Sequence, residues 1–99
     1  MQFDVRGRRY NFRFVTRLGR TKVGAKYLPV LGLCDPPDKQ RKHIRVVRGM
    51  EPKQELEIVL HELNHACFWD LDEAAITEAA MSQADALWKL GWRKIGIPE

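Results

Sequence analysis

Apolar and polar positions follow two different periods along this chain, one in each half. Over residues 1–49 the two kinds alternate in short runs, which is typical of strands with one buried face. We therefore predict a small antiparallel sheet of about three strands in this half. Tyr10, Phe12 and Phe14 are expected to face inward. Phe3 and Val5 begin a similar short alternation, and Ile44 and Val46 share one side of a later strand.

The later part of this β-rich half contains two breaks. Pro29 interrupts an apolar run at residues 27–34, and because proline has no N–H to donate, we expect strand pairing to begin after it. A turn is predicted at Asp35-Pro36-Pro37-Asp38. Residues 43–48 then follow as the returning strand of a hairpin, and an extended peptide could pair with this strand.

From residue 51 onward the apolar residues recur with the period of a helix. The first helix is predicted over 51–68, with Pro52 in its first turn, and Asp72 should cap a second helix that ends at Leu90 before Gly91. Residues 92–99 are expected to form a short packed tail. The stripe of the first helix expected to face the sheet consists of Leu56, Val59, Leu60, Leu63, Ala66 and Cys67, with Ile58 on the other side.

The length and composition indicate one domain over residues 1–99, with a β-rich half at 1–49 and a two-helix half at 50–92. No apolar run approaches the roughly 20 residues that span a bilayer, and no secretory signal is recognisable at the N-terminus. The expected location is therefore the cytoplasm, with no membrane partner.

The net charge of +4 conceals a strong asymmetry. Residues 1–50 contain 13 Lys and Arg against 3 Asp and Glu, whereas residues 51–99 contain 4 against 10. The basic half could attract nucleic acid or an acidic protein. The simpler interpretation is that these cations are solvated positions on the outer faces of strands.

Candidate chemistry is concentrated in the first helix, at His61-Glu62-Leu63-Asn64-His65. Residues four apart share one helix face, so His61 and His65 can bind one zinc ion through their imidazole nitrogens. Both histidines avoid the apolar stripe, which argues against a purely structural role. Glu62 is placed to act as a general base toward water at such a metal.

A catalytic zinc usually has three protein ligands and one open position. The helical phase places Glu73 at the inward edge of the second helix, near the C-terminal part of the first. We therefore expect Glu73 to be the third ligand. Asp70 in the turn, Glu78, or a water remain alternatives.

Taken together, the chain resembles a minimal zincin, a metallopeptidase with the His-Glu-x-x-His motif, in the glutamate-zincin arrangement. It is similar to small metallopeptidase-like proteins of tailed phages and prophages, and more distantly to SprT-like and ImmA/IrrE-type domains. The resemblance rests on residues 31–35, 61–66 and 70–73. It implies an α+β fold, Zn²⁺ bound by His61, His65 and an acid of the second helix, and Glu62 as the general base. A phage protein would act in the cytoplasm of its bacterial host.

The function expected from these observations is zinc-dependent hydrolysis of peptide bonds in a protein or peptide substrate. The chain lacks the Gly-x-x-His continuation of metzincins and offers no recognisable residue to stabilise an oxyanion. The alternative is therefore a metal-stabilised binding module without catalysis, whose basic sheet binds nucleic acid or an acidic protein.

Overall fold

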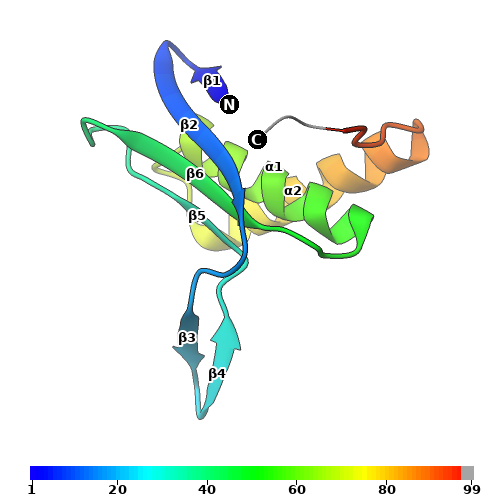
Figure 1. Cartoon of the computed structure of the whole chain (residues 1–99), viewed down its shortest axis with the longest axis horizontal. Helices are drawn as coiled ribbons and strands as arrows, with labels where there is room; N and C mark the ends of the chain where they lie inside the picture. The colour runs from blue at the N-terminus through cyan, green and yellow to red at the C-terminus, as the bar shows by residue number, and fades with distance from the viewer. Residues whose placement is uncertain (97–99) are drawn as a thin grey trace.

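Four strands form the main sheet, in the order β1-β2-β6-β5 (Figure 1). The computed structural model describes residues 1–96 of the chain. The strands of this sheet are β1 (Gln2–Val5), β2 (Arg8–Val15), β5 (Gly32–Cys34) and β6 (Lys42–Val47). Together with two helices they make the α+β fold that the sequence predicts, with more strands than expected.

The expectation of a purely antiparallel sheet was wrong, because β2 and β6 run parallel. The β1–β2 and β5–β6 pairs are antiparallel hairpins, as the alternation suggests. Since β6 pairs with β2 on one side and β5 on the other, it has no open edge. The expectation that residues 43–48 could pair with a peptide was therefore also wrong.

A separate hairpin of β3 (Arg20–Val23) and β4 (Lys26–Pro29) projects away from the main sheet (Figure 1). Its presence corrects the expectation that pairing begins after Pro29. This proline is instead the last residue of β4, opposite Arg20, where a missing N–H interrupts no ladder.

The core lies between the main sheet and α1 (Pro52–Cys67). In β2, Tyr10, Phe12 and Phe14 are buried, and the parallel register sets Phe12 beside Ile44 and Phe14 beside Val46. Both of these β6 residues are fully buried. The alternation of aromatic residues in β2 thus buries one face of the strand, as predicted.

The α1 helix lies between the sheet and α2 (Glu73–Lys89), since it contacts β5 and β6 as well as α2. On α2, Ile76, Ala80 and Ala84 are fully buried at a spacing of four residues, and the alanines allow the helices to approach closely. Within residues 1–96, neither helix has the length and apolar character needed to cross a membrane.

Two details of packing differ from expectation. Ile58 packs against the core cluster beneath the sheet, whereas Leu60 lines a groove facing α2. In the predicted tail, Trp92 is 65% exposed and Ile95 is 84% exposed, so apolar packing does not hold this segment. Residues 97–99 of the predicted tail lie outside the described residues.

Lys94 attaches the tail to the domain instead. Its Nζ forms a 2.5 Å ion pair with Glu55 of α1 and lies 4.5 Å from the ring centroid of Phe14. Glu55 is buried, so the lysine neutralises a carboxylate that would otherwise lie unpaired in a largely apolar environment.

Candidate metal centre

His61 and His65 lie one turn apart on the same face of α1. Helical geometry alone brings the two rings together, with their Nε2 atoms 3.2 Å apart. The two side chains are only 17% and 19% exposed. The helix that presents them begins with Pro52 in the first turn, where proline needs no hydrogen-bond acceptor for an N–H.

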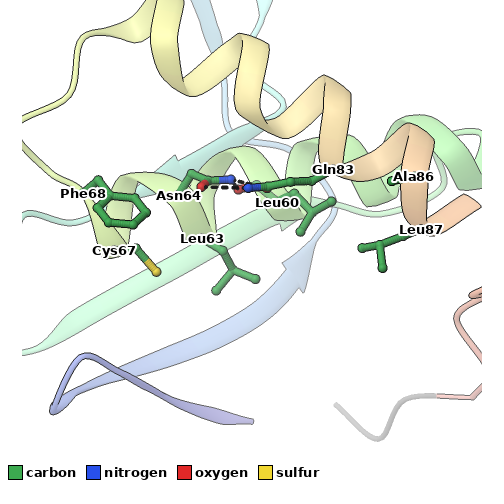
Figure 2. Close-up of a pocket in the computed structure, with 8 residues that line it drawn as sticks. All are labelled: Leu60, Leu63, Asn64, Cys67, Phe68, Gln83, Ala86 and Leu87. Carbon is green, nitrogen blue, oxygen red and sulfur yellow. Dashed lines mark hydrogen bonds between the residues drawn. The ribbon is translucent and has the colours of Figure 1, made fainter.

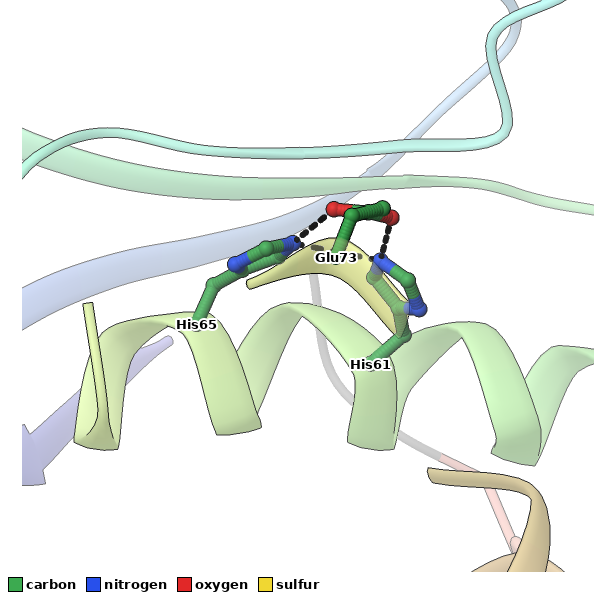
Figure 3. A group of neighbouring side chains, drawn as sticks. All are labelled: His61, His65 and Glu73. Carbon is green, nitrogen blue, oxygen red and sulfur yellow. Dashed lines mark hydrogen bonds and ion pairs between the residues drawn. The ribbon is translucent and has the colours of Figure 1, made fainter. Parts of the chain in front are cut away.

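Glu73, the first residue of α2, completes this group (Figure 3). Its Oε1 lies 2.7 Å from His61 Nε2, and its Oε2 lies 3.0 Å from His65 Nε2. The side chain of Asp72 accepts a 2.8 Å hydrogen bond from the backbone N–H of Ala75, which caps α2 as predicted. That cap fixes where α2 begins and therefore where the Glu73 carboxylate lies.

The three side chains form a donor set suited to a metal ion. Their ligand atoms all lie within 4.8 Å of one another. Two imidazole nitrogens and one carboxylate match the His₂Glu donors of catalytic zinc sites. A tetrahedral zinc with bonds of about 2.0–2.1 Å needs donors about 3.3 Å apart, close to the separation of the two Nε2 atoms.

The alternatives for the third ligand do not join this group. Asp70 and Glu78 are not among the residues whose ligand atoms gather with those of His61 and His65. Glu78 is five residues beyond Glu73 on α2, which turns it toward another side of the helix. The gathering of the His61, His65 and Glu73 ligand atoms favours Glu73 over Asp70 and Glu78. The role of Glu73 as a zinc ligand stays a prediction.

Glu62 lies beside the histidines but points toward β5, and it is only 6% exposed. Burial raises the pKa of its carboxyl to about 7, with a further contribution from the negative charge of Glu73. A carboxyl group with a pKa near neutrality can both accept and return a proton at physiological pH.

Gly32 on β5 is the residue of this site that sequence reasoning missed. A Cβ built on it would lie 2.7 Å from Glu62 Oε2 and 2.9 Å from Ile58 Cγ2, closer than real side chains approach. Only glycine therefore lets α1 and its buried carboxylate sit this close to the sheet. The available signal was an isolated glycine inside a strand pattern, which often marks a close approach.

Cys34 interacts with Glu62, and Tyr10 interacts with Cys34; both groups have raised pKa values. Burial is the main cause that raises the pKa of the Cys34 thiol to about 12, followed by the charges of Glu62 and Asp35. The Tyr10 hydroxyl donates a 3.2 Å hydrogen bond to the backbone oxygen of Asp35, and burial raises its pKa to about 12. Cys34 is not among the residues whose ligand atoms gather with those of His61, His65 and Glu73.

A separate concavity of about 520 Å³ lies between α1 and α2 (Figure 2). None of the three candidate ligands lines it. Asn64, inside the His-Glu-x-x-His stretch, crosses this groove with two hydrogen bonds to Gln83, of 2.6 and 3.3 Å. The motif thus also holds the two helices together. The lining residues are Leu60, Leu63, Asn64, Cys67, Phe68, Gln83, Ala86 and Leu87.

Comparisons with known proteins found no relative of this chain. The chain matches no protein-family model, no curated protein and no solved structure. Its function therefore has to be argued from the site itself.

Proposed function

We propose that this protein is a zinc-dependent peptidase whose metal ligands are His61, His65 and Glu73. The observation that carries the proposal is the convergence of these side chains from two helices, at 2.7 to 3.2 Å, next to the buried carboxyl of Glu62. Structural zinc sites are usually closed by four protein ligands. A three-ligand set beside a general base is the arrangement used for hydrolysis.

Zinc, when bound here, would polarise a carbonyl and lower the pKa of water. Glu62 would accept the proton of the attacking water and return it to the leaving amine. Its raised pKa suits both steps, because the proton is held neither too weakly nor too tightly near pH 7. Gly32 leaves the space in which this carboxyl lies buried against β5.

The substrate is proposed to be an extended peptide that pairs with β5, the edge strand on this side of the sheet. Val47 N–H donates to Leu31 O, and Asp35 N–H donates to His43 O, so the odd-numbered residues bond to β6. Gly32 and Cys34 consequently direct their N–H and C=O groups toward the open edge. A peptide paired there would run beside Glu62.

The proposal is tested with untagged protein purified without added metal. Elemental analysis should find about one zinc per chain, and a fluorescently labelled casein should be hydrolysed. Glu62→Gln should keep the zinc and the fold while losing hydrolysis. Absence of zinc from the wild type, or full hydrolysis by Glu62→Gln, would refute the peptidase.

One observation favours a second candidate, a metal-stabilised module without catalysis. His61 and His65 come from α1 and Glu73 comes from α2, so a bound ion would link two helices and stabilise the fold. In that case zinc removal would lower the thermal midpoint strongly, and no peptide substrate would be cleaved. The same Glu62→Gln protein would then behave as the wild type does.

A further inference from the structure

The β3–β4 hairpin projects from the rest of the protein, and its contacts are mainly between its own two strands (Figure 1). We call this hairpin the arm. All eight residues of its two strands are exposed. Gly24, with φ of +63°, opens the tight turn, and Val30 N–H closes the base with a 2.9 Å hydrogen bond to Gly19 O. Within the described part of the chain, the arm is thus a regular two-stranded ribbon whose main contacts join its own two strands.

The charge of this region is entirely positive. Between residues 5 and 34 the chain has eight Lys and Arg and no Asp or Glu. The cations of the arm and its base are Arg17, Arg20, Lys22 and Lys26. Among the ion pairs of residues 1–96, none joins an acid to any of these four cations.

The strand register distributes these residues over two faces, because residues directly opposite each other share a face. Arg20 and Lys22 lie on one face with Tyr27. Thr21, Val23, Lys26 and Leu28 lie on the other. Val23 is 55%, Tyr27 63% and Leu28 46% exposed, which is a large apolar surface for an arm whose contacts within residues 1–96 are mainly its own.

From these features we propose that the β3–β4 hairpin binds duplex DNA, with Arg20, Lys22 and Lys26 contacting phosphates. A two-stranded ribbon fits the major groove of B-DNA, which is about 12 Å wide. An acid-free cationic arm suits a uniformly anionic polymer better than a protein surface, where charges of both signs are usual. This binding function is additional to the proposed peptidase and independent of it.

The charge asymmetry of the chain would also orient the protein on DNA. Residues 51–99, which hold the candidate metal centre, contain 10 Asp and Glu against 4 Lys and Arg. Phosphates would repel this half, so the arm would approach the duplex while the helices face away. We therefore infer a tethering role for the arm, with no reaction on the DNA itself.

Binding is measured by fluorescence anisotropy with a labelled 20-base-pair duplex of arbitrary sequence, from 50 to 200 mM NaCl. The wild type should bind with strong salt dependence. The triple variant Arg20→Gln, Lys22→Gln, Lys26→Gln should bind at least about tenfold more weakly at low salt, with a salt slope smaller by about 2 to 3. These positions are exposed, so the variant should keep the wild-type circular dichroism spectrum.

The matched control, Lys39→Gln, Lys89→Gln, Arg93→Gln, removes the same charge outside the arm and should bind nearly as tightly as the wild type. An equal loss in both triple variants would overturn the proposal in favour of a general charge effect. Absence of binding at 50 mM NaCl would also overturn it. So would displacement of the DNA from the arm by polyglutamate at equal charge, since that outcome indicates an acidic protein partner.

Discussion

Gly32 and Glu62 are in contact across the junction between the main sheet and α1. The glycine has no side chain, and the space that a Cβ would fill, 2.7 Å from Glu62 Oε2, is taken by the glutamate carboxylate. A strand residue thus determines whether the proposed general base can occupy its buried position.

Gly32→Ala should therefore damage both the fold and the proposed activity. The added methyl group would displace Glu62 and Ile58, which is expected to cost about 1–3 kcal/mol of unfolding free energy. A carboxylate shifted by about 1 Å would lower hydrolysis roughly 100-fold, while zinc content should stay the same. Denaturant unfolding and the casein assay measure the two effects. Gly96→Ala is the control, because nothing lies within 4 Å of its added Cβ; equal behaviour of both variants would contradict the argument.

Glu73→Ala should weaken zinc binding by more than the roughly 10- to 100-fold that loss of an outer hydrogen-bond partner causes. The reason is that the carboxylate is the only donor from α2 in the group, 2.7 and 3.0 Å from the two imidazoles. Competition with a chromophoric chelator gives the affinity. Glu78→Ala, an exposed change on the same helix, should bind zinc as the wild type does. Loss of zinc from Glu78→Ala or Asp70→Ala, but not from Glu73→Ala, would assign the third ligand elsewhere.

Glu62 should make the stability of the metal-free protein depend on pH. Its pKa is about 7 in the folded state against an ordinary value of 4.5, so the folded protein holds an extra proton between these values. Its contribution to stability is complete below about pH 4.5 and is lost as pH rises through about 7. The separation of the two pKa values corresponds to roughly 3 kcal/mol at most.

The test is denaturant unfolding in the presence of a chelator at pH 5 and pH 8. The unfolding free energy of the wild type should fall by about 1–3 kcal/mol more than that of Glu62→Gln, which cannot titrate at this position. Both proteins contain the same histidines, so the difference reports on Glu62. Parallel pH profiles would mean that the carboxyl is not held in an apolar environment.

Lys94→Ala should destabilise the protein by about 2 kcal/mol, because it leaves the buried Glu55 carboxylate without its cation and uncovers the Phe14 ring. The double variant Lys94→Ala, Glu55→Gln should recover much of that loss, since an amide is less costly to bury than an unpaired charge. Lys89→Ala is the control: its ion pair with Asp85 is exposed and should contribute less than about 1 kcal/mol. Equal effects of Lys94→Ala and Lys89→Ala would show that the tail is not anchored at this point.

The elements of this protein that depend on local interactions were predictable from its sequence. The 3.6-residue period places His61 and His65 on one face of α1 whatever the rest of the fold does. The Asp72 cap sets the start of α2, and because few residues connect the helices, Glu73 has to lie near His65. The alternation of Tyr10, Phe12 and Phe14 likewise selects the buried face of β2 without reference to its partners.

Only the tertiary structure decided which strands pair, in which direction they run, and which helix residues contact them. The same alternation in β2 and β6 permits either a parallel or an antiparallel pair, and in the structure the two strands run parallel. A glycine inside a strand pattern suggests a close approach at Gly32, but only the tertiary structure identifies Glu62 as the residue that approaches it. The β3–β4 ribbon lacks a buried face, so it has no apolar pattern from which its position could be read. Periodicity reports burial along one segment, whereas the identity of the partner depends on contacts between residues far apart in the chain.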